Sequence, residues 1–203
     1  MSQPNTNNPT FPAISEQDAS ELVQDRIKFK LYTAEHHLNN LKYLEKSGGS
    51  MPSSFQSRVQ WEMEIDHLLA QLIGAKDALL VLINDRLGLG LDIKEIDLGR
   101  ITNRLNSINK GTLVANLNKL ACQSGSWLWI LNDLRNQSMH RGIINIKVHQ
   151  HFHENVNTHK SWEDRPKVCL LQTELEVIPY FEESTKNMKN LIEDIKNNEL
   201  LLR

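Results

Sequence analysis

The chain has 203 residues, a formal net charge of −2 at pH 7, 39% hydrophobic and 24% charged residues. This length and composition predict one globular domain with a sizeable core. The charge excludes a strong overall attraction to nucleic acid, so any such contact would rest on a local patch. The cysteines, Cys122 and Cys169, form no C-x-x-C pair, and no apolar run approaches the ~20 residues of a membrane span. Because the N-terminus lacks the pattern of a secretory signal, we expect a cytoplasmic protein.

The N-terminal residues separate a tail from a domain. Residues 1–14 are rich in Asn, Pro, Ser and Thr, which predicts a disordered tail, and residues 15–203 are expected to form the single domain. Ser15 is followed by Asp18 three residues later, a spacing that predicts an N-cap. From this cap, apolar residues at helical spacing predict one long amphipathic helix over 15–46.

The middle of the chain is predicted to be helical throughout. A Gly- and Ser-rich loop over 47–54 precedes a second long helix over 55–86, whose apolar middle predicts a central position in a bundle. A shorter helical segment is predicted over 93–108. A further helix is expected over 112–141, with a break around Gly125.

The spacing of apolar residues changes in the C-terminal part of the chain. Apolar and polar residues alternate over 144–149, which predicts a β-strand, and a second strand is predicted over 167–177. Together they form a small antiparallel β-hairpin, an elaboration over 142–177. Pro179 opens a last amphipathic helix. The predicted fold class is therefore mainly α, a bundle of four to five helices with a small β-hairpin inserted before the C-terminal helix.

The segment 126–142 carries the most informative pattern. One side of its predicted helix is expected to face the core, with Trp127, Ile130, Leu131, Leu134 and Ser138. The opposite side carries Asn132, Asp133, Arg135, Asn136 and His140, interrupted by Leu128, Trp129 and Met139. The helix is expected to stop at Gly142. Its end would therefore present an arginine, an asparagine and a histidine next to exposed apolar groups.

Arg135, Asn136 and His140 resemble the Arg-x4-6-His motif of the HEPN superfamily, which most often reads Arg-Asn-x-x-x-His at the end of a core helix. The resemblance covers residues 15–142 and the final helix, with two long early helices and a shorter third. It implies a HEPN-like bundle. Many members are metal-independent endoribonucleases that act as dimers. It therefore implies a homodimeric RNA-cleaving toxin or defence protein that uses no metal or other cofactor and has a possible antitoxin or partner protein.

The residue types of the motif suit cleavage of RNA at its own 2′-hydroxyl. His140 titrates near neutral pH and is the expected general acid or base. Arg135 is expected to stabilise charge on the phosphate, and Asn136 to hold a phosphate or sugar oxygen or to orient His140. The residues expected to bind substrate beside them are Asn132, Asp133 and Arg141. As a catalytic helper, however, Asp133 is less expected, because a carboxylate at such a position is more often a solvated surface group. In some toxin members a tyrosine stands two residues after the histidine; here Gly142 stands there, so regulation through that tyrosine is not expected.

Arg135 and His140 lie about 140° apart around a helix, so one chain spreads them over its surface. A symmetric pair of such helices would line a shared cleft with two copies of each residue. The apolar Leu128, Trp129 and Met139 would then be covered at the interface. This arrangement favours a dimeric active site.

Three other interpretations stay open. Arg135 and His140 suit the C-terminal dipole of their helix without any further role. A non-catalytic HEPN-like module would use the same cleft to bind nucleotides, RNA or a partner protein. Finally, His149, His151 and His153 fall on one face of a strand, where two of them are spaced to share a zinc ion. That pattern lacks a third ligand and equally fits a half-exposed strand edge, so no metal site is predicted.

Overall fold

The computed structural model describes residues 14–47, 55–140, 146–149, 167–170 and 174–197. Helices make up most of this part of the chain, as predicted from the sequence. The elements in order are α1 (Glu16–Gln24), α2 (Arg26–Ser47), α3 (Phe55–Leu87), the 3₁₀ turn η1 (Ile93–Glu95), α4 (Leu98–Ser107), α5 (Thr112–Cys122), α6 (Trp127–His140), β1 (Ile146–His149), β2 (Lys167–Leu170) and α7 (Val177–Asn197). None of the described helices is both long enough and apolar enough to cross a bilayer.

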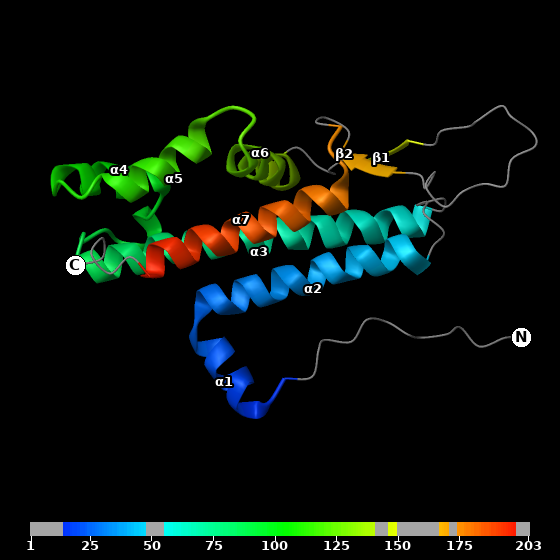
Figure 1. The fold of residues 1–203 in the computed structure, drawn as a ribbon, viewed down its shortest axis with the longest axis horizontal. Helices are drawn as coiled ribbons and strands as arrows, with labels where there is room; N and C mark the ends of the chain where they lie inside the picture. Colours follow the sequence, from blue (N-terminus) through cyan, green and yellow to red (C-terminus); the bar gives the residue numbers. More distant parts are fainter. Residues whose placement is uncertain (1–13, 48–54, 141–145, 150–166, 171–173, 198–203) are drawn as a thin grey trace, which may run out of the picture.

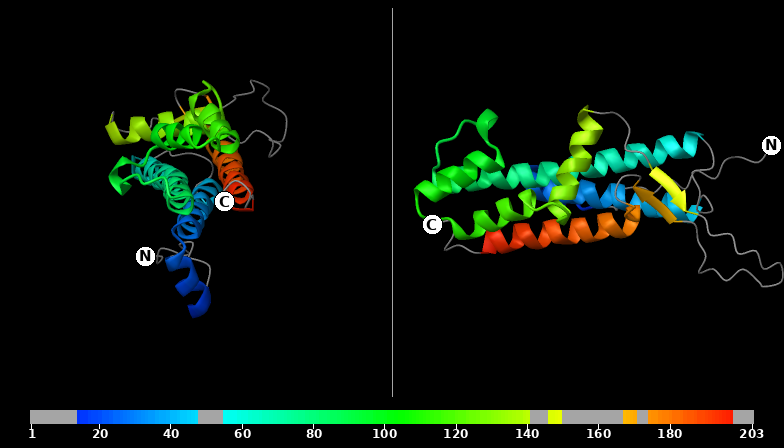
Figure 2. Two further views of the ribbon diagram at one scale, coloured as in Figure 1. Left: turned by 90° about the vertical axis from the view of Figure 1, so that its left-hand side faces the viewer. Right: turned by 90° about the horizontal axis from the view of Figure 1, so that it is seen from above.

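The long helices α2, α3 and α7 lie side by side along the longest axis of the molecule (Figure 1). α4 and α5 lie near one end of this bundle, and α6 crosses α3 at a steep angle (Figure 2). α1 turns away from the bundle and contacts α2. The predicted tail and the predicted first loop concern residues 1–13 and 48–54, which lie outside the described residues.

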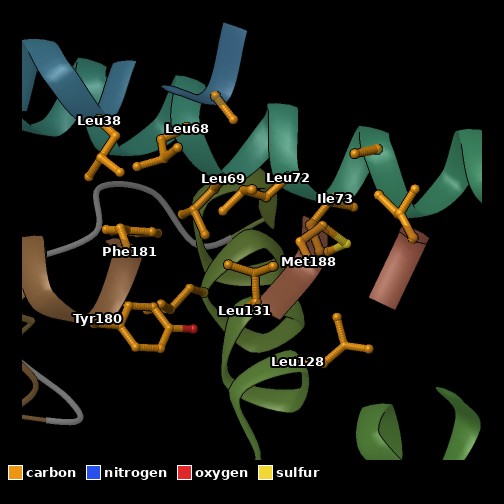
Figure 3. Packing of buried hydrophobic residues seen from close by; sticks show 14 of the residues in the cluster. Leu38, Leu68, Leu69, Leu72, Ile73, Leu128, Leu131, Tyr180, Phe181 and Met188 are labelled. Carbon is orange, nitrogen blue, oxygen red and sulfur yellow. The ribbon is translucent and has the colours of Figure 1, made fainter. Parts of the chain in front are cut away.

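α3 is the central helix, as its apolar middle predicts. Its buried side chains lie on more than one face because α2, α6 and α7 all pack against it. They are Trp61, Ile65, Leu68, Leu69, Leu72, Ile73, Ala75, Leu79, Leu80, Ile83 and Asn84. In Figure 3 the leucines of α3 meet Leu131 of α6 and Phe181 and Met188 of α7. Each such side chain, fully buried, contributes roughly 1.5–3 kcal/mol of transfer free energy.

The prediction of one unbroken helix over 15–46 is wrong at Asp25. Ser15 does cap the first helix, accepting the backbone N–H of Asp18 at 3.1 Å. The helix ends at Asp25, whose backbone is extended, with φ −92° and ψ 98°. The Asp25 carboxylate then accepts the N–H groups of Ile27 and Lys28, each at 3.0 Å, and so begins α2. The apolar period continues across the break, so it gives no sign of it.

The end of α3 is fixed by a buried amide. Asn84 is buried, and its side chain accepts the N–H of Leu91 at 3.1 Å and donates to the Leu91 carbonyl at 3.2 Å. Gly88, with φ +58°, lets the chain reverse between these two residues. The turn after α3 is therefore held by side-chain hydrogen bonds as well as by its glycine.

β1 and β2 pair as an antiparallel two-stranded sheet, with Ile146 opposite Leu170. Both side chains are buried in the hydrophobic cluster. The residues between the strands, 150–166, lie outside the described part of the chain. With four residues in each strand, the pair does not alter the mainly helical class.

The predicted second strand over 167–177 is wrong from Glu174 onward, and residues 171–173 lie outside the described part of the chain. The described residues on either side of this gap are hydrogen-bonded to each other: the N–H of Leu170 donates to the carbonyl of Leu175, and the N–H of Glu174 donates to the carbonyl of Leu170, each at 2.9 Å. Glu174 has φ +57°, which a strand does not allow. Val177 is already the first residue of α7, where it is buried against the core.

Candidate functional site

The helix that carries the Arg-Asn-x-x-x-His pattern, α6, begins after a tight turn. Gly125 has φ +81°, and this is where the sequence predicts a break. The hydroxyl of Ser126 accepts the N–H of Trp129 at 3.3 Å and caps the helix. The hydroxyl of Tyr180 donates to the carbonyl of Trp127 at 3.2 Å and ties the start of α6 to α7.

The buried side of α6 differs from the predicted one. Leu128, expected among the exposed residues, is fully buried together with Leu131 and Leu134, whereas Trp127 and Ile130 are only half-buried. Figure 3 places Leu128 and Leu131 on the core side of the helix. The physical reason is that α6 is covered by α3 and α5 at once, which moves its buried arc toward Leu128. Trp129 is half-buried as well, so the expected apolar surface beside the motif is smaller than predicted.

Two hydrogen bonds fix how α6 lies on α3. Lys76 of α3 donates to the side-chain carbonyl of Asn132 at 3.3 Å, and the hydroxyl of Ser138 donates to the carboxylate of Asp66. Asn132, Arg135 and Ser138 follow one another at three-residue spacing and share one stripe of the helix. Arg135 therefore lies on the stripe of α6 that borders α3, between these two bonds.

The other predicted site residues differ in their surroundings. Arg135 is half-buried, and its guanidinium makes no ion pair or hydrogen bond with any other described residue. Asn136, the next residue, is exposed. Asp133 is half-buried and accepts the amide of Gln137 at 2.8 Å. Asn132 and Asp133 thus have protein partners, whereas no hydrogen bond or ion pair joins the side chains of Arg135 and Asn136 to the described part of the chain.

The remaining predicted residues lie at or beyond the edge of the described chain. His140 is the last residue of α6, and its backbone is helical; its side chain and the whole of Arg141 lie outside the described residues. His151, His153 and the side chain of His149 also lie outside the described residues. The C-terminal end of α6 projects from the bundle in both views of Figure 2.

A row of charged residues on α3 was missed by the sequence analysis. Arg58, Glu62 and Asp66 are spaced by four residues and so lie on one face of the helix. The carboxylate of Asp66 accepts a hydrogen bond from the hydroxyl of Ser138 of α6. Arg58 donates to the carbonyl of Ile146 of β1 at 3.5 Å. The signal in the sequence is this spacing of charges on a helix that is otherwise predicted to be central.

Glu62 has the most perturbed acidity in this row. Burial raises the pKa of its carboxyl to about 7, and the charge of Asp66 adds to this. The backbone N–H of Ile146 and the charge of Arg58 act in the opposite direction without cancelling the effect. Glu62 therefore titrates near neutral pH, as groups that transfer protons in enzymes commonly do.

A second polar cluster joins α2 to α3. His37 contacts Glu64 at 2.7 Å between Nδ1 and Oε2, and Asn40 donates to the other oxygen of Glu64 at 3.2 Å. The ring of His67 lies 5.0 Å from that of His37. No three of the described His, Cys, Asp and Glu residues are arranged to hold a metal ion. This cluster holds two helices together through hydrogen bonds.

A groove of about 530 Å³ runs between α2 and α7. Lys42 and Glu182 form an ion pair across it at 2.6 Å, and Lys189 pairs with Glu35. Its acidic and basic side chains are matched in number, so it favours neither an anion nor a cation. The groove does not include any residue of α6.

Arg135 and Asn136 of α6, together with the charged row of α3, thus form the candidate site of the molecule. The stripe of α6 that borders α3 carries Arg135, and Ser138 on the same stripe is bonded to Asp66. Comparison of the chain with protein-family models, with curated proteins and with solved structures finds no match.

Proposed function

We propose that the protein is a metal-independent endoribonuclease with a HEPN-like helical bundle, which acts in the cytoplasm as a homodimer and serves as a toxin or defence factor. The observation that carries the proposal is the state of Arg135. The residue is half-buried, and its guanidinium has no ion-pair or hydrogen-bond partner among the described residues, next to the exposed Asn136. An unpaired guanidinium at a partly desolvated position favours an anion, and its two parallel N–H donors match a phosphate.

The proposed reaction begins with attack of the RNA 2′-oxygen on the adjacent phosphorus. The bond from phosphorus to the 5′-oxygen breaks, leaving a cyclic phosphate on one product and a 5′-hydroxyl on the other. Arg135 stabilises the negative charge that builds up on the phosphate oxygens. His140 transfers a proton, and Asn136 holds a phosphate or sugar oxygen. Asn132, Asp133 and Arg141 contact the RNA at the edge of the site.

The position of the motif supports a dimer. Arg135 and His140 lie about 140° apart around the helix, and the C-terminal end of α6, where His140 is the last residue, projects from the bundle (Figure 2). Two copies that meet through these ends place Arg135 of one chain near His140 of the other. A partner protein or antitoxin that covers the same ends would block the cleft.

The test is incubation of the purified protein with total RNA and with tRNA in excess EDTA. We expect the wild type to leave cyclic phosphate ends, and Arg135→Ala and His140→Ala each to lower the rate by at least ~100-fold. Arg104→Ala, a change at an exposed arginine of α4, is the matched control and should leave the rate unchanged. Circular dichroism checks that each variant is folded.

Other outcomes are equally informative. Cleavage that survives both motif substitutions contradicts the assignment of the site. A folded, dimeric wild type that cleaves nothing and does not slow growth on expression favours a non-catalytic module that binds RNA, nucleotides or a protein. The net charge of −2 is the observation in favour of that second function, because it provides no overall field for RNA.

A further inference from the structure

The charged row of α3 holds the chain on both sides of His140. Asp66 binds Ser138, two residues before the histidine, and Glu62 and Arg58 bind the backbone of Ile146, six residues after it. Asp66 and Glu62 are one turn apart, about 6 Å along α3. The charged row of α3, with Glu62 in its middle, therefore contacts Ser138 and Ile146, described residues before and after the motif histidine in the chain.

Glu62 differs from the other acids of α3 in having a buried carboxylate oxygen without a hydrogen-bond partner in the described part of the chain. Its Oε1 is buried and makes no hydrogen bond with any described group, although the side chain as a whole is only half-buried. A buried carboxylate oxygen with no donor is costly, by roughly 1–3 kcal/mol or more. Such an oxygen favours either a proton of its own or a hydroxyl donated by a ligand.

The two neighbouring acids each have side-chain partners on another helix. Asp66 accepts the hydroxyl of Ser138, and both oxygens of Glu64 are hydrogen-bonded, to His37 and Asn40. The charged groups that act on Glu62 are Arg58 and Asp66, and its pKa of about 7 leaves it partly ionised at neutral pH. Of these three acids, only Glu62 has a carboxylate oxygen that is buried and makes no hydrogen bond with a described group.

We propose that Glu62 is a second proton-transfer residue of this site, the base that takes the proton of the RNA 2′-hydroxyl. The inference rests on the proposed function and completes it. As the 2′-oxygen forms its bond to phosphorus, its proton passes to the Glu62 carboxylate. The bond from phosphorus to the 5′-oxygen breaks, and that oxygen takes a proton from His140. Base and acid then come from different elements, α3 and α6, and Arg135 acts on the phosphate between them.

The test uses an RNA oligonucleotide that spans a cleavage site mapped in tRNA, and the same oligonucleotide with sulfur in place of the 5′-bridging oxygen. A thiolate leaves without a proton, so the sulfur substrate needs a base but no acid. We expect Glu62→Gln to lower kcat by at least ~100-fold on both substrates. His140→Ala should be slow on the oxygen substrate and close to wild type on the sulfur substrate.

Binding and folding are measured in parallel. The Kd for an oligonucleotide with a 2′-deoxy residue at the cleavage site should not change in Glu62→Gln, because the amide keeps a hydrogen-bonding group at the same position. Glu193→Gln, at an exposed acid of α7, is the matched control and should cleave both substrates at the wild-type rate. A loss confined to binding would indicate a structural role for Glu62 and overturn the proposal.

The outcomes separate this inference from the proposed function. Wild-type cleavage with equal cleavage by Glu62→Gln overturns the role of Glu62 alone, and so does rescue of Glu62→Gln by the sulfur substrate. No cleavage by the wild type overturns both.

If Glu62→Gln does not fold, the wild type and Glu62→Asp are compared on the sulfur substrate as a function of pH. The cleavage rate should still rise with pH in both proteins, and the pH at the midpoint of this rise should differ between the wild type and Glu62→Asp. A rate that does not depend on pH, or a midpoint that is the same in both proteins, overturns the proposal.

Discussion

Asp25 shows how one side chain can both separate and join helices. Its backbone N–H donates to the Glu21 carbonyl at the end of α1, and one carboxylate oxygen caps the start of α2. The other oxygen accepts the ammonium of Lys196, at the end of α7, at 3.2 Å. A residue at the surface of the bundle thus fixes the boundary of two helices and binds a third.

The first prediction separates the two contributions of Asp25. Asp25→Ala removes the cap and the ion pair, and it should lower the free energy of unfolding by about 1–2 kcal/mol in urea at pH 7. Asp25→Asn keeps a capping oxygen and loses only the charge, so it should lower the free energy of unfolding by less than Asp25→Ala does. Asp92→Ala is the matched control, because Asp92 precedes η1 without making a side-chain cap bond.

The same residue gives a pH dependence with a defined sign. Burial raises the pKa of Asp25, but the N–H groups of Lys28 and Ile27 and the ammonium of Lys196 outweigh it, so the pKa lies below its usual 3.8. A lowered pKa contributes stability above the unfolded value, and this is lost as the pH falls through the folded value. The difference between wild type and Asp25→Asn should therefore shrink as the pH is lowered below about 4, and a constant difference would contradict it.

At the residue scale, the sequence predicts local features and misses those that need a distant partner. The spacing of Ser15 and Asp18 predicts the first cap because the cap bond is local. The break at Asp25 is hidden, because apolar residues continue on either side and an aspartate in a helical pattern does not reveal which N–H groups it will accept. The role of Glu62 is hidden too, because its partner, the backbone of Ile146, is 84 residues away (146 − 62).

At the scale of elements, α2 and α3 are held together by a half-buried polar contact as well as by leucines. Glu64 of α3 is bonded to His37 and Asn40 of α2, and its side chain retains 23% of its exposure. Burial raises the pKa of Glu64, but these hydrogen bonds and the charges of His37 and His67 outweigh it, so the pKa is lowered. The ionised form is therefore the one that stabilises the pair of helices.

The second prediction follows from this contact. Glu64→Gln keeps the shape of the side chain and removes its charge, and it should lower the free energy of unfolding at pH 7 by roughly 1–2 kcal/mol. The loss should diminish as the pH falls below about 4.5, the usual pKa of the carboxyl, because the wild type then loses the same charge. Glu193→Gln should have no effect in the same urea titrations. An effect of Glu64→Gln that persists in acid would show that the hydrogen bonding of the carboxyl group, and not its charge, matters.

The pattern of α6 shows what periodicity can and cannot supply. The helix, its start after Gly125 and its amphipathic character follow from local spacing. Which residues are buried depends on how many neighbours cover the helix, and this is why Leu128 is in the core although it was expected on the polar side. The strand predicted to reach Val177 fails from Glu174 onward for a similar reason, because alternation does not reveal the backbone hydrogen bonds that Leu170 makes with Glu174 and Leu175.

At the scale of the whole molecule, α1 stands apart from the bundle (Figure 1). None of its residues is buried, and Val23 keeps 71% of its exposure. The hydrophobic cluster begins with Ile27 of α2 and continues through α3, α6 and α7. The stability of the bundle should therefore depend little on α1.

The third prediction tests this directly. A chain that starts at residue 25 keeps the cap of α2 and should unfold with a free energy within about 1 kcal/mol of the full chain, because changes at exposed positions seldom exceed this. A chain that starts at residue 28 also loses Asp25 and Ile27, and it should be clearly less stable. Urea denaturation of the three chains checks both statements. If the chain that starts at residue 25 has a much lower free energy of unfolding than the full chain, the contacts of α1 stabilise the bundle and the prediction is wrong.

The ion pair between Asp25 and Lys196 also bears on how the chain could be reconnected. It joins residues 171 positions apart, and so brings the start of α2 and the end of α7 within the length of one side chain. A short linker from the end of α7 to the start of α2 would then close the chain into a ring, which a new cut between α2 and α3 would open again. Such a circular permutant would retain α2 to α7 in their places, with α3 as its first helix and α2 as its last.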